Sequence, residues 1–194
     1  VLLLPGSRRR EIELHVPVLR EVVERLSTER PDLQIVMSRA PTVAASLIEA
    51  ALGETISKVH VLEGGTYDGL KHAAVAVVAS GTATVEAALS ETPMVVVYRV
   101  GRLTYALGRR FVKVPFFSMV NLIAGRKLVP ELIQRDMTAK AIRAQIDSLL
   151  EPEAAEEMKR GLREVKSKLG GKGASARAAE AVLTFLEARS SGLS

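Results

Sequence analysis

Short segments made almost entirely of apolar residues constrain the fold of this chain more than any other feature. Three of them, residues 1–4, 74–79 and 94–98, each precede a stretch with helical periodicity. A strand that is apolar on both sides is typical of a parallel sheet covered by helices on both faces. Because strands and helices alternate along the chain, the sequence predicts an α/β fold with a doubly wound parallel sheet.

Apolar periodicity places the expected elements along the chain. Strands are expected at residues 1–4, 33–37, 59–62, 74–79 and 94–98, and helices at residues 42–52, 67–72, 82–90, 103–111, 138–150, 152–169 and 175–188. A further helix follows the first strand, and Pro17 is expected in its first regular turn, after a less regular start over residues 9–16. Residues 114–122 fit either type of element. A glycine-rich hinge is expected to separate a sheet domain, residues 1–170, from a tail helix, residues 171–194.

The composition argues against several classes of function. The chain has no cysteine, so it has no disulfide and no thiolate metal site, and its three histidines lack the spacing of metal ligands. No strand is followed by a G-x-G-x-x-G or Walker A motif. The net charge is +5, but with four Phe, three Tyr and no Trp the chain lacks the stacking platforms of single-strand binders. We therefore expect no metal, no cofactor and no nucleic-acid partner.

The first strand leads into Gly6, Ser7 and Arg8, immediately before a helix. In an open parallel sheet, ligands bind beyond the carboxyl ends of the strands. Glycine lets the backbone approach a ligand, N–H groups at a helix start attract anions, and an arginine adds a forked donor. The turn is a candidate anion site, although a tight turn with a serine cap would have the same residues.

A second turn of the same kind follows residues 74–79. It contains Ser80, Gly81 and Thr82, and Glu86 lies about one helical turn later. Two such turns in one sheet favour a paired site for phosphate groups. A carboxylate near phosphates needs its own partner, and the diol of a ribose is a suitable one. Alternatively, Glu86 is an acid near the helix start that interacts favourably with the helix dipole, by about 0.3–1 kcal/mol.

Two further segments carry polar candidates. Tyr98 and Arg99 end the strand at residues 94–98, where packing is the alternative role. Asn121 is the only asparagine in the chain. Glu131 and Gln134 are three residues apart, which would place them on one face of a helical turn. Such side chains could hydrogen-bond the hydroxyl groups of a sugar, or they could face solvent.

These segments, in this order, resemble the C-terminal half of the lipid-A-disaccharide synthase family, which are GT-B glycosyltransferases of Gram-negative bacteria. The matching sequence is LLPGSR at residues 3–8 with EI at 11–12, ASGTATVE at 79–86, PMVVVYR at 93–99, NLIAG at 121–125 and VPELIQ at 129–134. The chain departs from the family pattern at Val120, where the family usually has proline.

The resemblance implies a fold and a reaction. The fold would be the Rossmann-like C-terminal domain of a GT-B enzyme, and this chain would be part of a longer protein. The reaction would transfer 2,3-diacylglucosamine from its UDP derivative to 2,3-diacylglucosamine 1-phosphate, with inversion and release of UDP. The acceptor and the catalytic base would belong to an N-terminal domain absent from this chain. We therefore expect no catalytic residue here and no activity of this chain alone.

The resemblance also implies roles for the candidate residues. Those expected to bind the UDP pyrophosphate are Gly6, Ser7, Arg8, Ser80, Gly81 and Thr82, with Glu86 on the ribose. Those expected to line the nucleotide or sugar pocket are Tyr98, Arg99, Asn121, Glu131 and Gln134.

The acylated substrates of this family imply a cytoplasmic protein that is peripheral to the inner membrane. A possible basic and apolar membrane contact consists of Arg109, Arg110, Lys113, Phe116, Phe117 and Met119, although a helix end before a buried strand is the simpler interpretation. The tail helix would present an apolar face that invites self-association, formed by Ala178, Val182, Phe185 and Leu186.

Two alternatives to this family remain open at the level of sequence. The chain could be the UDP-binding domain of another GT-B enzyme, such as a UDP-N-acetylglucosamine transferase or epimerase. It could also be a non-catalytic module that binds anions or membranes. Selectivity for UDP over inorganic phosphate would separate the enzymes from the generic anion-binding module.

Overall fold

The computed structural model describes residues 1–101, 105, 115–170, 173 and 179–186. Within this part of the chain, six parallel strands form one sheet in the order β3-β2-β1-β4-β5-β6. The strands are β1 (Leu2–Leu4), β2 (Val36–Arg39), β3 (His60–Glu63), β4 (Ala76–Ala79), β5 (Met94–Tyr98) and β6 (Glu131–Ile133). The strand order reverses between β1 and β4, so the doubly wound parallel sheet expected from the sequence is confirmed.

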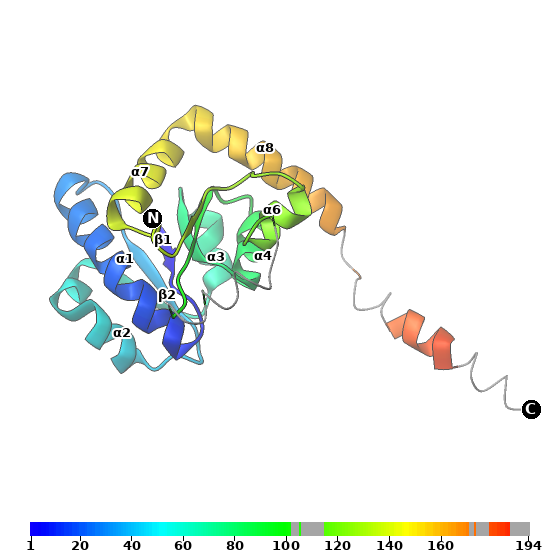
Figure 1. Cartoon of the computed structure of the whole chain (residues 1–194), viewed down its shortest axis with the longest axis horizontal. Coiled ribbons are helices and arrows are strands. Elements are labelled where there is room, and N and C mark those ends of the chain that lie inside the picture. Colours follow the sequence, from blue (N-terminus) through cyan, green and yellow to red (C-terminus); the bar gives the residue numbers. More distant parts are fainter. Residues whose placement is uncertain (102–104, 106–114, 171–172, 174–178, 187–194) are drawn as a thin grey trace, which may run out of the picture.

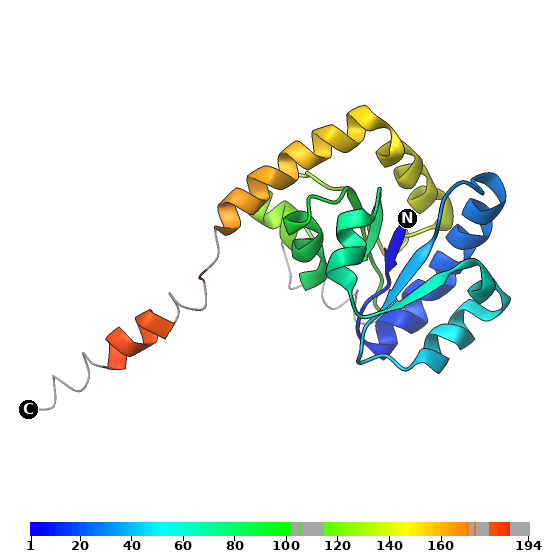
Figure 2. The same ribbon diagram turned by 180° about the vertical axis from the view of Figure 1, so that it is seen from behind.

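Helices cover both faces of this sheet (Figures 1 and 2). The helices up to α8 are α1 (Arg9–Glu29), α2 (Ala45–Leu52), the 3-10 helix η1 (Gly53–Lys58), α3 (Thr66–His72), α4 (Thr82–Leu89), α6 (Met119–Ala124), α7 (Ala139–Leu150) and α8 (Pro152–Leu169). Helices α1 and α2 pack on one face, and α3 and α4 on the other. The helix α7 lies against α1, whereas α8 lies against α4 and α6.

Burial on both faces explains why the central strands are apolar throughout. All four residues of β4 are buried, and β1 beside it is buried along its whole length. At the amino end of β5, the Met94 N–H donates a hydrogen bond to the sulfur of Met158 in α8. Helix α8 therefore packs near the amino end of β5.

The structure corrects the expected start of α1. The helix is continuous from Arg9, and Pro17 lies inside it instead of in its first regular turn. A proline in a helix interior costs about 3 kcal/mol because it removes a backbone hydrogen bond and crowds the preceding turn. Here Pro17 is exposed, while Ile12 and Val16 before it and Leu19 after it are fully buried or nearly so. Core packing on both sides of the proline keeps the helix intact.

A second correction concerns Glu131 and Gln134, which do not share a face of a helical turn. Residues Glu131–Ile133 form β6, which pairs in parallel with β5 through Val96 and Tyr98. The strand supplies hydrogen-bond partners along one side of β5. The expected strand at residues 33–37 also begins later, at Val36, because the Leu33 N–H closes a turn onto the Arg30 carbonyl. The undecided stretch at residues 114–122 contains the start of α6.

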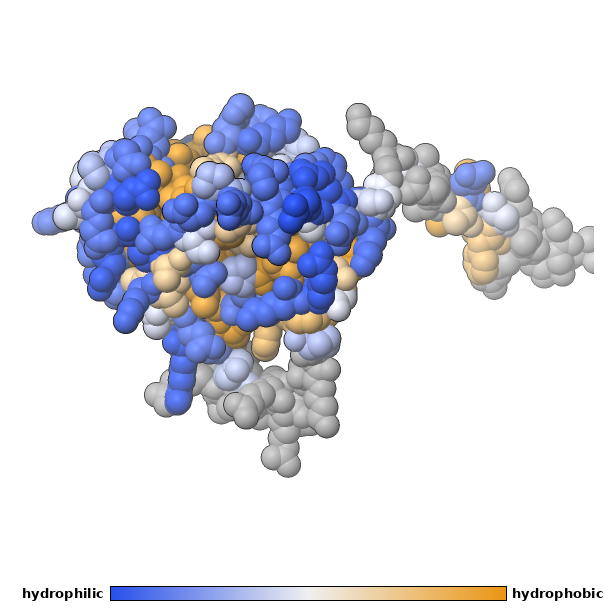
Figure 3. Space-filling view, turned by 90° about the horizontal axis from the view of Figure 1, so that it is seen from above, coloured by the Kyte–Doolittle hydropathy of each residue, from blue (hydrophilic) through white to orange (hydrophobic). Residues whose placement is uncertain are grey.

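The chain beyond α8 contains a described helical stretch at residues 179–186. Its side chains at Val182, Leu183, Phe185 and Leu186 are each more than half exposed, and apolar atoms are visible on this segment in Figure 3. Ala178 and most of the helix expected at residues 103–111, including Arg109 and Arg110, lie outside the described residues, as does Lys113. No helix in the described part has the length and apolarity needed to cross a membrane.

Candidate functional site

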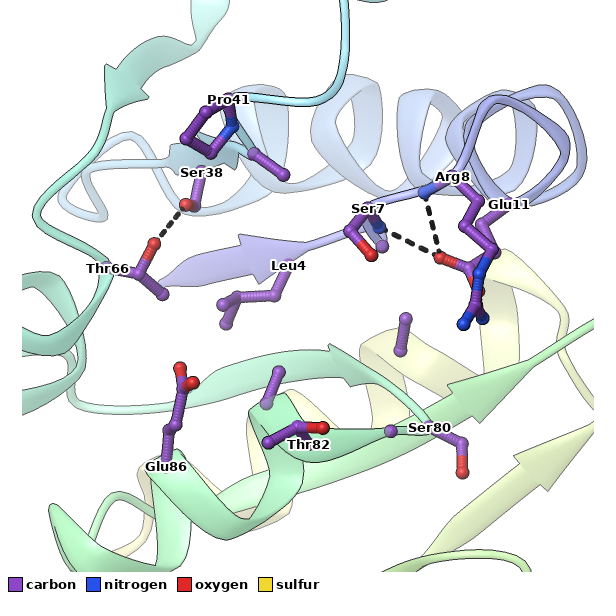
Figure 4. Close-up of a pocket in the computed structure, with 15 residues that line it drawn as sticks. Leu4, Ser7, Arg8, Glu11, Ser38, Pro41, Thr66, Ser80, Thr82 and Glu86 are labelled. Carbon is purple, nitrogen blue, oxygen red and sulfur yellow. Dashed lines mark hydrogen bonds and ion pairs between the residues drawn. The ribbon is translucent and has the colours of Figure 1, made fainter.

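A cavity of about 340 Å³ lies at the carboxyl ends of β1 and β4, where the strand order reverses (Figure 4). This volume is within the range of small-molecule pockets, about 300–1,000 Å³. All residues that the sequence assigned to pyrophosphate and ribose line it, namely Gly6, Ser7, Arg8, Ser80, Gly81, Thr82 and Glu86. The two turns expected to form a pair are therefore brought together around one space.

The first wall of the cavity is the turn between β1 and α1. Gly6 has a φ of +119°, a left-handed conformation that favours glycine, and a Cβ at this position would collide with the Glu11 carboxylate. Glu11 Oε2 accepts hydrogen bonds from the backbone N–H groups of Ser7, at 2.8 Å, and Arg8, at 3.2 Å. Its Oε1 lies 3.1 Å from Nη1 of Arg8. Glu11 therefore fixes the shape of this turn.

The second wall is the turn between β4 and α4. Gly81 is the residue that caps α4, and the first N–H groups of any helix have no partner within the helix. The side chain of Ser80 is directed away from the cavity and donates to the Phe117 carbonyl at 2.8 Å. Ser80 thus contributes backbone to the cavity, while its hydroxyl anchors the segment that precedes α6.

Glu86 and two residues that sequence reasoning missed form the remaining side of the cavity. The Glu86 carboxylate is directed into the space from α4 (Figure 4). Ser38, at the end of β2, and Thr66, at the start of α3, lie in the same part of the cavity, and their hydroxyl oxygens are 2.7 Å apart. The rule that singled out the other strand ends could have found Ser38, because β2 ends at the same edge of the sheet.

Tyr98 and Arg99 do not line this cavity. The Arg99 guanidinium donates instead to the carbonyls of Gln134 and Met137, and so fastens the segment that follows β6. The Tyr98 ring makes an edge contact with the His15 ring, with centroids 6.0 Å apart. Both residues make packing contacts within the domain, which was the alternative role considered for this segment.

Asn121, Glu131 and Gln134 also lie outside the cavity. Asn121 is fully buried, and its side chain bonds the backbone of Leu128 and Val129 and the carboxylate of Glu131. The Gln134 side-chain amide lies against the backbone of Val100, and both groups are satisfied when the amide is oriented with its nitrogen toward the Val100 carbonyl, at 3.2 Å, and its oxygen toward the Val100 N–H, at 3.0 Å.

Glu131 stabilises the start of α6. Its carboxylate accepts from the N–H groups of Phe117, at 3.0 Å, and Ser118, at 2.8 Å, and from the Asn121 amide at 2.8 Å. Burial acts to raise the pKa of Glu131, but these hydrogen bonds outweigh it and hold that pKa below its ordinary value. The carbonyl of the same Phe117 accepts a hydrogen bond from the Ser80 hydroxyl. Phe117 therefore connects Glu131 to the second wall of the cavity.

His15 is a further residue whose role the sequence did not indicate. It is fully buried on α1, and burial lowers the pKa of its ring. Its Nε2 accepts from the Arg99 N–H at 2.9 Å, so Nδ1 carries the proton and donates to the Pro5 carbonyl at 2.7 Å. His15 thereby connects the first wall to the end of β5. Its place on the apolar face of α1 was the only available signal.

Among the described residues, no group of three or more His, Asp or Glu side chains could hold a metal ion. The family model described as "Lipid-A-disaccharide synthetase" matches residues 1–185. The chain belongs to this family.

Curated members of the lipid-A-disaccharide synthase family align with nearly all of the chain. The protein of Myxococcus xanthus (strain DK1622) is 45% identical over 186 residues, covering 95% of this chain and 48% of that protein. The protein of Solibacter usitatus (strain Ellin6076) is 43% identical over 189 residues, covering 96% of this chain and 49% of that protein. The chain thus spans about half the length of these relatives.

Solved structures with low sequence identity share the fold. The calicheamicin glycosyltransferase CalG4 superposes with a TM-score of 0.64 at 19% identity, covering 96% of this chain and 43% of that one. UDP-GlcNAc 2-epimerase from Neisseria meningitidis, solved with UDP-GlcNAc bound, gives a TM-score of 0.62 at 16% identity, covering 94% and 44%. The shared fold alone does not separate this chain from the epimerase alternative, but the family match does.

Proposed function

We propose that the cavity between the β1–α1 and β4–α4 turns binds the UDP part of a UDP-linked sugar. One observation carries the proposal: a helix start and an arginine line the same cavity as an inward-facing carboxylate. The N-terminus of α4 and Arg8 suit the diphosphate. Glu86, one turn further along α4, suits the hydroxyl groups of the ribose.

The chain then acts as the donor-binding half of lipid-A-disaccharide synthase. The whole enzyme transfers 2,3-diacylglucosamine from its UDP derivative to 2,3-diacylglucosamine 1-phosphate. When the bond to the sugar breaks, negative charge grows on the departing UDP. Once the donor is bound, Arg8 and the first N–H groups of α4 face that charge and stabilise it, which lowers the barrier. The acceptor site and the catalytic base belong to another part of the whole protein, so this chain alone does not turn over.

The proposal includes a division of the chain and its location. Residues 1–170 form the nucleotide-sugar domain and residues 171–194 the tail. The substrates are acylated, so the enzyme works in the cytoplasm at the surface of the inner membrane. The exposed apolar side chains of the tail, Val182 and Phe185 among them, give copies of this chain a surface for self-association.

Calorimetric titration of the chain tests the proposed ligand. We expect saturable binding of UDP, weaker binding of GDP and much weaker binding of inorganic phosphate. Equal affinities for the two nucleotides would contradict a uridine-specific cavity. Tighter binding of the UDP-diacylglucosamine donor than of UDP-N-acetylglucosamine would favour the lipid A reaction over another UDP-sugar enzyme.

A further inference from the structure

In the turn between β1 and α1, the hydrogen-bond donors are already paired with a side chain of the protein itself, that of Glu11. The Ser7 and Arg8 N–H groups both donate to the Glu11 carboxylate, which the Arg8 guanidinium also contacts (Figure 4). The Glu11 side chain is only 13% exposed, whereas that of Arg8 is 79% exposed. A carboxylate thus lies on the donors that the phosphates of a ligand would use.

The charges around the cavity make this arrangement unfavourable for an anionic ligand. The described residues that line the cavity include one cation, Arg8, and two carboxylates, Glu11 and Glu86. Like charges at close range repel strongly where water is partly excluded. A diphosphate that approaches the first turn meets a negative group there, and it gains the donors of that turn only if the group releases them.

We propose that Glu11 is an internal competitor of the diphosphate: it holds the donors of the first turn in the free protein and gives them up when a nucleotide binds. The inference rests on the proposed function, because it requires a phosphate ligand in this cavity. In the exchange, Arg8 passes from a carboxylate to a phosphate, and the two N–H groups keep an acceptor throughout. The turn is therefore preformed before binding, and Glu11 lowers the affinity and speeds the release of the product UDP.

A purely structural role for Glu11 makes a different prediction. A glutamate three residues after the capping residue commonly accepts a hydrogen bond from the backbone at the start of a helix, and this bond stabilises the helix. If that were its only role, loss of the carboxylate would leave phosphate affinity unchanged or reduce it. Competition predicts the opposite sign.

Glu11→Gln separates the two roles, because the amide oxygen still accepts from the backbone but carries no charge. We expect pyrophosphate to bind about tenfold more tightly to this variant, a change equivalent to about 1.4 kcal/mol. Uridine, which has no phosphate, should bind with unchanged affinity. The matched control is Glu13→Gln, which removes a charge from the same helix turn, where Glu13 pairs with Arg9 and Arg10. An equal gain in this control, or no gain in Glu11→Gln, overturns the proposal.

A measurement on the unaltered chain keeps the test valid if the variant folds poorly. Pyrophosphate should shift the NMR resonances of the Glu11 carboxylate carbon and of the Ser7 and Arg8 amides together, with one saturation curve. Resonances that stay fixed while pyrophosphate saturates the protein would overturn the competition. A different result would contradict the proposed function itself: UDP and GDP would bind equally well, both to the native chain and to Glu11→Gln.

Discussion

Replacement of Asn121 by alanine should destabilise the domain strongly without a direct effect on the cavity. The Asn121 side chain is fully buried, and it bonds both the N–H and the carbonyl of Val129, which is itself fully buried. Each buried polar group left without a partner costs about 1–3 kcal/mol. With about 2 kcal/mol for each of the two Val129 groups, the free energy of unfolding should fall by about 4 kcal/mol, a large share of the roughly 5–15 kcal/mol of a typical domain.

Urea unfolding followed by circular dichroism measures this change. The control is Leu122→Ala on the same helix, because Leu122 is 45% exposed and its removal should cost no more than about 0.5 kcal/mol. A loss below about 1 kcal/mol for Asn121→Ala would refute the hydrogen-bond argument. If Asn121 instead contacted the sugar, the variant would lose donor affinity and keep its stability.

Asn121→Asp tests the same geometry through charge. The new carboxylate still accepts from the backbone N–H groups, but it faces the Glu131 oxygen that the Asn121 amide now contacts at 2.8 Å. Two carboxylates at this distance cannot both ionise cheaply. The variant should be unstable at neutral pH and recover part of its stability as the pH falls to about 5 and one group of the pair takes up a proton. Stability equal to that of the native chain at pH 7 would contradict the contact.

Three further predictions concern the cavity and its support. Arg8→Ala should weaken UDP binding by about 1.5 kcal/mol, the lower end of the range for a bond to a charged group, and leave uridine binding unchanged; an unchanged UDP titration would remove Arg8 from the site. Glu86→Gln should weaken UDP more than pyrophosphate in the same titration, and equal losses would reduce Glu86 to a helix residue. Since burial lowers the pKa of His15, the unfolded chain binds the proton more tightly, so stability should fall as the pH drops below about 6.5 and be unaffected above it. The dependence of the urea midpoint on pH, between about pH 7 and 5, measures this effect. His15→Gln should weaken that dependence, and an unchanged dependence would mean that other groups cause it.

The sheet and the two turns could be predicted from the sequence because their signals are local. A run such as Ala76–Ala79 has no polar face, so only burial on both sides accommodates it. Ser80 and Gly81 follow it directly, and the helix that begins at Thr82 determines the position of Glu86. The reversal of strand order then brings the two turns to one cavity without further information from the side chains.

The remaining features depend on contacts between distant parts of the chain. Asn121 and Glu131 look like surface polar residues in sequence, and only the pairing of β6 with β5 brings the Glu131 carboxylate to the start of α6. His15 reaches Arg99 across the domain. Pro17 looks like a helix boundary until the packing around it is known. In each case tertiary packing overrides the local signal.

The position of β1 in the sheet has a consequence for how the chain is made. On the ribosome, β1 is synthesised before both of its neighbours, but β4 follows it only after α1, β2, α2, β3 and α3. Until then, one edge of the central strand has unpaired backbone N–H and C=O groups, a feature that promotes aggregation. Such long-range parallel pairing is slow. A nascent chain from which β4 has not yet emerged from the ribosome should therefore recruit chaperones far more strongly than one from which β4 and β5 have emerged.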